Sequence, residues 1–179
     1  ASDRQEHAQS PRIPCESLAG LFLGDGAIVS AVAVPAAGAI PAYCRVLATV
    51  EPETDIELRL PENWEQRLLL SPGSGLQGFI PDLNSRGVRL IEGYAVVASN
   101  SGHRDPTGGA TRFLDAPILI QDYSYGAIGK TVHLAKAVLR EYYGREPKYS
   151  YYSGCSSGGR EGLNAAAKFG KEFDGILAG

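Results

Sequence analysis

The sequence predicts an α/β fold in which short strands alternate with helices around a central sheet. Three observations indicate this class. A short, continuously apolar run at Arg67–Ser71 is typical of a central strand. The run Ser124–Tyr143 has the spacing of an amphipathic helix. The aromatic, β-prone run Lys148–Tyr152 leads through a Ser/Gly-rich turn into a helix rich in small residues.

The chain begins with a segment that has little regular pattern. Residues 1–42 are rich in Ala, Gly and Pro, with one short apolar run at Ile28–Val34, and are expected to be a loop-like amino-terminal extension. Residues 43–179 are expected to form a partial core domain. Its first two strands are Tyr43–Val50 and Asp55–Leu60, and the second alternates strictly between apolar and charged residues. The two predict an antiparallel edge of the sheet with one polar face.

The inner strands carry the features that matter for function. A glycine-rich loop at Pro72–Gly78 follows the strand at Arg67–Ser71 directly. The next strand is expected at Tyr94–Ser99, and the amphipathic helix after it is expected to end at Gly144. The remaining elements are strands at Tyr149–Ser153 and Phe173–Leu177 and a helix from Gly158 to Gly170 between them.

The turn between the strand at 149–153 and its helix is a Gly-x-Ser-x-Gly motif centred on Ser156. In α/β-hydrolases this motif is the nucleophile elbow, a strained strand-to-helix turn that exposes the serine hydroxyl. The alternative is a Ser/Gly-rich surface loop, but the flanking strand and helix favour the elbow. The oxyanion-hole donors would be the N–H of Ser157 and the N–H of Gly75, with Gly73 as second choice. The expected fold is therefore the amino-terminal part of an α/β-hydrolase sheet, through about the sixth strand, without the remaining strands.

The catalytic acid and base are not expected within these residues. In this fold the acid and then the histidine follow the serine in the chain. All three histidines precede Ser156, and His7 and His133 are expected in a disordered terminus and on a helix surface. A local triad of Ser156, His103 and Asp105 is the alternative, but it reverses the chain order, and neighbouring His and Asp side chains rarely align. A structural or substrate-lining role is favoured for His103.

The three cysteines form an odd set. Cys15 and Cys44 are predicted to form a disulfide, which would close a loop of about thirty residues and stabilise the fold by roughly 3–4 kcal/mol. Cys155, beside the proposed nucleophile, has three explanations: a buried free thiol, a nucleophile in its own right, or a disulfide to a cysteine outside this chain. The apparent pairing of the other two favours the third explanation.

Composition narrows the class of protein and of partner. With 44% hydrophobic and 21% charged residues, the chain is typical of soluble globular proteins. A net charge of −3 argues against nucleic-acid and anionic-membrane partners. No apolar run approaches the roughly 18 residues that span a bilayer. The sequence has no Met and no apolar signal core at its start, which favours processing or trimming. Together with the paired cysteines, this predicts a secreted or periplasmic protein.

Several segments resemble the tannase and feruloyl esterase family, which also includes mono(2-hydroxyethyl) terephthalate hydrolases. The resemblance runs from Cys44 onward and is strongest over Ser153–Gly162 and Glu172–Gly179; it also includes Asn63-Trp64, Gly93–Val96 leading to Gly102-His103, Ala135–Ala137 and Tyr142–Gly144. It implies a serine carboxylic ester hydrolase acting on aromatic esters of the feruloyl or galloyl type through an acyl-enzyme. The alternative is a non-catalytic hydrolase-like fragment or binding module.

The resemblance also implies what this chain lacks. Ser156 would be the nucleophile, and Cys155 would be half of a disulfide that ties the elbow to the loop bearing the catalytic histidine. The acid, the histidine and the second cysteine would come from a disulfide-linked second polypeptide or from the remainder of the same precursor. No cofactor or metal is expected in this chain, since the family's structural calcium belongs to the absent lid. The loop reads Ser-Pro-Gly-Ser-Gly, so Gly73 and Gly75 both stay candidates.

Overall fold

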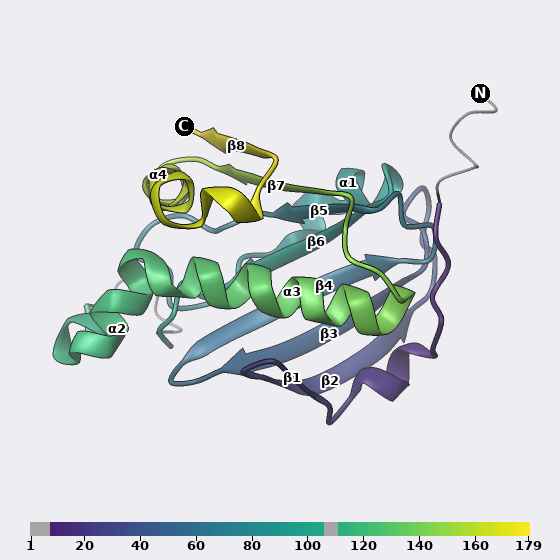
Figure 1. Cartoon of the computed structure of the whole chain (residues 1–179), viewed down its shortest axis with the longest axis horizontal. Coiled ribbons are helices and arrows are strands. Elements are labelled where there is room, and N and C mark those ends of the chain that lie inside the picture. The colour runs from purple at the N-terminus through teal and green to yellow at the C-terminus, as the bar shows by residue number, and fades with distance from the viewer. Residues whose placement is uncertain (1–7, 106–110) are drawn as a thin grey trace.

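The computed structural model describes residues 8–105 and 111–179, and a mixed eight-stranded sheet runs through them (Figure 1). The strand order is β1-β2-β3-β4-β6-β5-β7-β8. The strands are β1 (Phe22–Leu23), β2 (Gly26–Val34), β3 (Tyr43–Val50), β4 (Thr54–Pro61), β5 (Arg67–Leu70), β6 (Tyr94–Ser99), β7 (Tyr149–Gly154) and β8 (Gly175–Ala178). The α-helices are α1 (Gly87–Ile91), α2 (Pro117–Gln121), α3 (Ala127–Tyr143) and α4 (Ser157–Phe169). Short 3₁₀ helices lie at Cys15–Leu18, Leu83–Arg86, Arg112–Asp115 and Gly170–Glu172, and a π-helical turn at Asp122–Gly126.

The expectation of a loop-like start is wrong for residues 26–34. These residues form β2, which pairs antiparallel with β3 from Gly26↔Val50 to Val34↔Tyr43. An Ala-rich run has a weak strand signal of its own, but pairing with β3 satisfies its backbone and buries Ile28 and Ala31. The pair β3–β4 is antiparallel as predicted, but β1 and β2 lie outside it, so it is not the edge. The division of the chain at residue 42 stays a prediction.

The polar face of β4 is also not solvent-exposed, contrary to expectation. Glu57 is 5% exposed and Arg59 is 7% exposed. The Glu57 carboxylate accepts hydrogen bonds from Arg59 Nε and from an Arg45 guanidinium nitrogen, each at 2.8 Å. Burial alone would raise the pKa of Glu57, but the two arginines hold it below its ordinary value. Strict alternation predicted the strand correctly but could not reveal that its charged side chains pair with one another.

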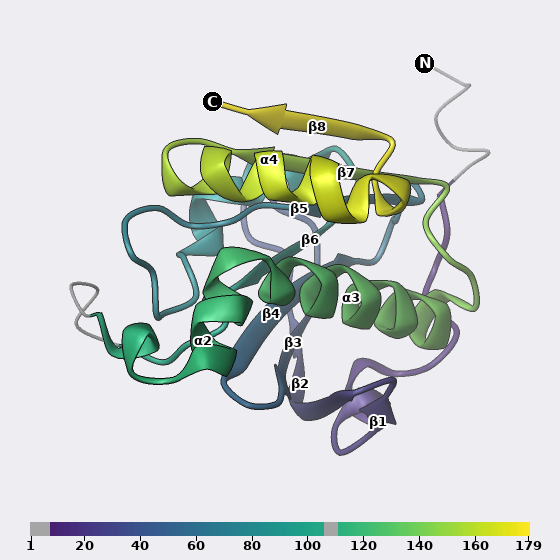
Figure 2. The ribbon, with the colours of Figure 1, turned by 60° about the vertical axis from the view of Figure 1, so that its left-hand side comes forward.

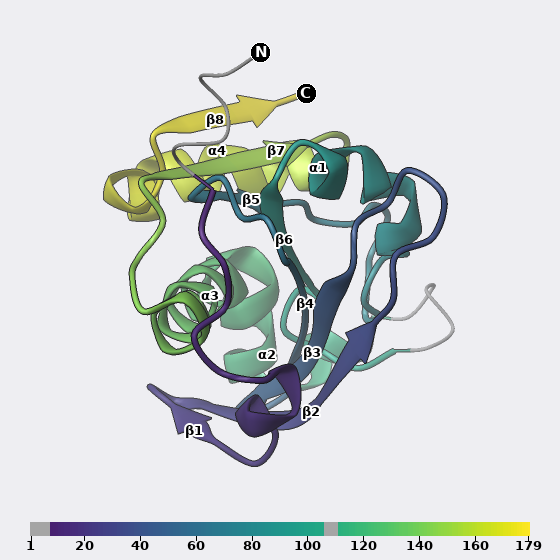
Figure 3. The ribbon, with the colours of Figure 1, turned by 90° about the vertical axis from the view of Figure 1, so that its right-hand side faces the viewer.

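The centre of the sheet is parallel and carries the predicted features. β5 lies between β6 and β7 and is parallel to both, as expected of a central strand. Figure 2 shows α3 and α4 on one face of the sheet, and Figure 3 shows α1 on the face opposite α3. The larger core packs under α3, where Val132, Ala135 and Leu139 are fully buried. The predicted helix at 124–143 is confirmed as the π-helical turn at Asp122–Gly126 followed by α3.

Two further expectations concern the covalent framework and membranes. Cys15 and Cys44 form the predicted disulfide, which joins the first 3₁₀ helix to β3. Within the described ranges, no helix is long and apolar enough to cross a membrane. The order of strands, the glycine-rich loop and the turn into α4 confirm a partial α/β-hydrolase fold.

Candidate active site

Ser156 lies in a tight turn between β7 and α4. Its backbone has φ 61° and ψ −121°, a combination that side-chain-bearing residues rarely adopt. Two backbone hydrogen bonds to the end of β8 fix the turn, from Ser156 N to Gly179 O at 2.8 Å and from Gly179 N to Gly154 O at 3.0 Å. The residue is exposed. The predicted nucleophile therefore has the strained, exposed geometry of an elbow.

The glycines of the motif are required by close backbone approach. A Cβ atom on Gly154 would lie 2.6 Å from the carbonyl oxygen of Gly158, and one on Gly159 would clash directly with the carbonyl oxygen of Gly179. Both contacts are to backbone atoms, which cannot move aside as a flexible side chain could. The small residues thus let α4 pack directly against the ends of β7 and β8.

The glycine-rich loop after β5 contacts this turn at its Pro72-Gly73 end. A Cβ atom on Gly158 would lie 2.9 Å from Pro72 Cγ and 3.2 Å from Gly73 O. Gly75 lies farther along the loop in an exposed turn, with φ 68°. Among the hydrogen bonds of the described residues, none has the Ser157 backbone N–H as donor. That N–H, at the start of α4, is thus available to a ligand.

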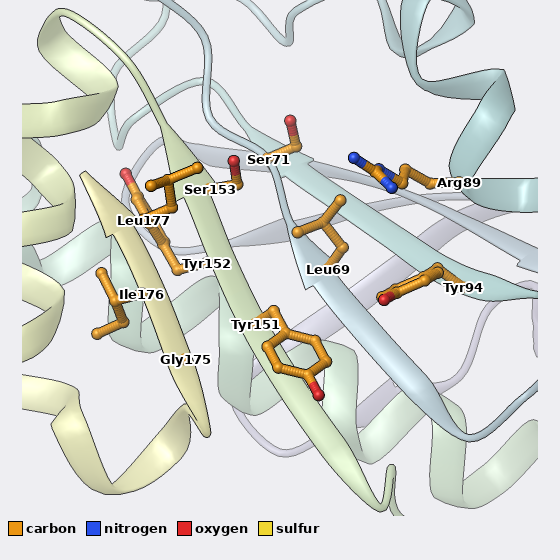
Figure 4. Close-up of a pocket in the computed structure, with 10 residues that line it drawn as sticks. All are labelled: Leu69, Ser71, Arg89, Tyr94, Tyr151, Tyr152, Ser153, Gly175, Ile176 and Leu177. Carbon is orange, nitrogen blue, oxygen red and sulfur yellow. The ribbon is translucent and has the colours of Figure 1, made fainter. Parts of the chain in front are cut away.

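Two cavities lie near the ends of the inner strands. One, of about 270 Å³, is lined by Pro72, Gly73, Phe79, Leu83 and the exposed free thiol of Cys155. The other, of about 420 Å³, lies on the α1 side of the sheet, and Figure 4 shows the residues that line it. Its walls include Leu69, Tyr94, Tyr151, Leu177 and Arg89 of α1, but none of residues 155–157. The smaller cavity is therefore the one that adjoins the elbow.

His103 has no hydrogen-bonding contact with the elbow among the described residues. His103 is fully buried, and its ring packs against both rings of the stacked pair Phe113 and Tyr123, with centroid distances of 4.9 and 5.4 Å. Neither ring nitrogen has a hydrogen-bond partner among the described residues, so the local triad with Asp105 is not assembled. Burial lowers the pKa of His103 and favours the neutral imidazole.

The other described histidine, His133, lies on α3. The His133 side chain is 60% exposed on α3, with Nε2 3.4 Å from a Glu172 carboxylate oxygen. This confirms a surface position. His7 lies outside the described residues. Among the residues whose placement is given, no group of three His, Cys, Asp or Glu side chains could hold a metal ion.

A buried polar cluster beside the elbow was not predicted from the sequence. Glu161 of α4 is 4% exposed, and its Oε1 accepts hydrogen bonds from Ser101 Oγ at 2.5 Å and Gln77 Nε2 at 3.1 Å. Burial raises its pKa above the ordinary value. One signal for the cluster exists in the sequence. Gly158, Glu161 and Ala165 recur at helical spacing, which places the carboxyl on the small-residue face that packs inward.

Comparison with known proteins matches the chain to one family. A family model described as tannase and feruloyl esterase matches residues 39–179. An esterase of Xanthomonas campestris pv. campestris is 36% identical over 92% of this chain and 31% of its own length. A probable feruloyl esterase B-2 of Aspergillus flavus is 36% identical over 76% of this chain and 26% of its own. A mono(2-hydroxyethyl) terephthalate hydrolase of Piscinibacter sakaiensis is 29% identical over 84% and 28%. The chain thus spans about a third or less of these relatives' lengths.

Solved structures agree with these matches. Feruloyl esterase B from Aspergillus oryzae superposes with a TM-score of 0.78 at 26% identity, over 89% of this chain and 36% of that one. A tannin acyl hydrolase from Aspergillus niger gives a TM-score of 0.65 at 21% identity, over 89% and 34%. The second likeness is one of fold alone.

Proposed function

Because the chain belongs to the tannase and feruloyl esterase family, we propose that it supplies the nucleophile and the oxyanion hole of a carboxylic ester hydrolase. The observation that carries this proposal is Ser156, exposed on a strained turn at the start of α4. Backbone strain at an exposed serine between a strand and a helix has a ready explanation in nucleophilic catalysis. The relatives named as esterases support the same reaction class.

In the proposed reaction the Ser156 hydroxyl oxygen attacks the ester carbonyl carbon. A histidine from outside this chain takes the hydroxyl proton and passes it to the leaving alcohol. The resulting acyl-enzyme is then hydrolysed by water, which releases the acid and restores the serine. The oxyanion is held by backbone donors. Loss of one such donor typically costs roughly 2.7–4 kcal/mol of transition-state stabilisation.

The first donor is the N–H of Ser157, which lies at the positive end of the α4 dipole. The second comes from the glycine-rich loop. Gly75 is the first choice from the sequence, but the contact of Pro72 and Gly73 with Gly158 favours Gly73. A donor must lie about 3 Å from the oxyanion, and the part of the loop that touches the elbow meets that requirement more readily.

The substrate is proposed to be a small aromatic ester of the feruloyl or galloyl type. The cavity beside the elbow has apolar surface from Pro72, Phe79 and Leu83, next to polar groups that include Ser74 and Asp82. An aromatic ring is attracted to such apolar surface. The Aspergillus flavus relative is named a probable feruloyl esterase, and the superposed Aspergillus oryzae structure is feruloyl esterase B. We propose that the acyl preference is set largely by parts of the protein outside this chain.

The acid, the histidine and the partner of Cys155 are proposed to lie in further polypeptide, either a disulfide-linked second chain or the remainder of the same precursor. On the α1 side of β7 and β8, Tyr149 is 41% exposed and Leu177 is 69% exposed. Parallel sheets are normally covered on both faces, so this surface is a place for further chain to pack. The Cys15–Cys44 disulfide supports a secreted or periplasmic location.

The test is hydrolysis of a ferulate or gallate ester by the native protein, isolated without reductant, together with labelling by a fluorophosphonate probe. Wild type and a Ser153→Ala control should hydrolyse the ester and carry the label on Ser156. Ser156→Ala should lose both while keeping its circular dichroism spectrum. Residual turnover in Ser156→Ala would contradict the proposal. Electrophoresis and intact mass, with and without reductant, show whether a second chain is attached through Cys155; an unattached, unlabelled chain supports the non-catalytic alternative.

A further inference from the structure

Strained backbone is concentrated around one buried carboxyl. Among the described residues, the non-glycine positions with positive φ are Gln66, Gln77, Ser101 and Ser156. Gln77 ends the glycine-rich loop, Ser101 follows β6, and Ser156 is the proposed nucleophile. Such conformations persist only where the surrounding contacts determine them, and they gather at functional sites. For two of these residues, the contact that does so is the same side chain.

That side chain is Glu161, which lies five positions after Ser156 on α4. Its Oε1 accepts hydrogen bonds from Ser101 Oγ and Gln77 Nε2 at 2.5 and 3.1 Å. The two donors come from different loops, one after β5 and one after β6. Gly78 also pairs with the second loop, through its N–H to Asn100 O at 3.1 Å. One carboxyl oxygen therefore joins the elbow helix to both loops at the end of the sheet.

The cluster reaches the oxyanion loop through the Gln77 side chain. Gln77 is 1% exposed, and a Cβ atom on Gly73 would lie 3.0 Å from its Oε1. The Gln77 amide thus lies directly against the backbone of Gly73, the part of the loop that touches the elbow. A shift of Glu161 would be transmitted to Gly73 through these close contacts, since buried groups at this packing density cannot relax independently.

We propose that Glu161 is a positioning residue that fixes the glycine-rich loop relative to Ser156, so that the loop N–H is held where the oxyanion develops. The inference rests on the proposed esterase function for its purpose, but its physical content is separate. It requires the acceptor oxygen of Glu161 and the donors of Gln77 and Ser101. The other polar groups near the carboxyl are the Arg160 guanidinium at 3.7 Å and the Tyr152 hydroxyl, which donates to Gly158 O.

Hydrogen exchange on this chain reports how firmly the two loops are held, and it needs no enzymatic turnover. The reporters are the Gly78 N–H and the Gly102 N–H, which are bonded to Asn100 O and Asn100 Oδ1. In Glu161→Ala their exchange should accelerate by about tenfold or more, while sheet amides such as that of Val46 stay within about twofold. Glu161→Gln keeps an acceptor oxygen and should restore rates close to wild type. Val132→Ala, a buried truncation in α3, is the control for general destabilisation.

Two outcomes would overturn the proposal. In one, Gly78 and Gly102 exchange in Glu161→Ala no faster than in Val132→Ala. In the other, Glu161→Gln is as fast as Glu161→Ala. If Glu161→Ala does not fold, Gln77→Ala and Ser101→Ala remove the donors singly, and each should loosen its own loop first. Unchanged exchange rates in both of these variants would also overturn the proposal. Ser156→Ala removes the proposed nucleophile but none of these hydrogen bonds, so its exchange rates should match those of wild type. The exchange result is therefore independent of the esterase proposal, and failure of one is distinguishable from failure of the other.

Discussion

The backbone of Ser156 makes a quantitative prediction about stability. At φ 61° and ψ −121° the residue occupies a conformation like the first central position of a type II′ turn, where glycine predominates. Strain of this kind costs about 1–3 kcal/mol for a residue with a side chain. Glycine removes it, but the greater freedom of the unfolded chain takes back roughly 0.5–1 kcal/mol. Ser156→Gly should therefore stabilise the fold by about 0.5–2 kcal/mol, although it removes the proposed nucleophile.

Ser156→Ala is the matched control because it also lacks the hydroxyl but keeps a Cβ atom and the strain. Urea unfolding of both variants, followed by circular dichroism, gives the free-energy difference. At this chain length each kcal/mol raises the melting temperature by about 2–4 °C, so thermal unfolding should show the glycine variant melting a few degrees higher. If the two variants unfold at the same urea concentration, the backbone of Ser156 is not strained. The strain then no longer supports Ser156 as the nucleophile.

Three further predictions concern groups near and far from the elbow. Because burial raises the pKa of Glu161 above 4.5, the native state holds that proton more tightly than the unfolded state, and stability is lost as the pH rises through the native pKa. Urea unfolding from about pH 4 to about pH 8 should show a smaller loss of unfolding free energy in Glu161→Gln than in wild type. Gly159→Ala should destabilise by about 1–3 kcal/mol in thermal melts through its backbone clash, whereas Gly170→Ala, with open space around its Cβ, should be nearly neutral. Reduction of Cys15–Cys44, 29 residues apart, should lower the unfolding free energy by roughly 3–4 kcal/mol, measured by urea titration with and without dithiothreitol.

Local signals in the sequence were enough to predict the elbow. The flanks of Ser156 show the β-prone run, the small residues and the helical spacing within about twenty positions, so no long-range contact is needed to recognise them. The central strand β5 was predicted from its own short apolar run. The disulfide Cys15–Cys44 was predicted because paired cysteines have a distinctive chemistry.

What the sequence did not reveal depends on partners far away in the chain. β2 becomes a strand because β3 pairs with it, not because its Ala-rich run favours one. The charges on β4 are buried because Arg59 and Arg45 share Glu57, and strict alternation in the strand reads the same whether its charged face is wet or paired. The Glu161 cluster joins residues 60 and 84 positions apart, and only the inward-facing spacing on α4 could have hinted at it.

The surfaces around Ser156 restrict where a base can approach. α4 and the end of β8 occupy one side of the turn, through the contacts of Gly159 and Ser156 with Gly179, and the Pro72-Gly73 corner occupies another. We expect a base to approach along the 270 Å³ cavity, whose wall includes the exposed thiol of Cys155. A loop that delivered a histidine by this route would pass Cys155. A disulfide at that position would fix the imidazole beside the proposed nucleophile, which is the preorganisation that general-base catalysis needs.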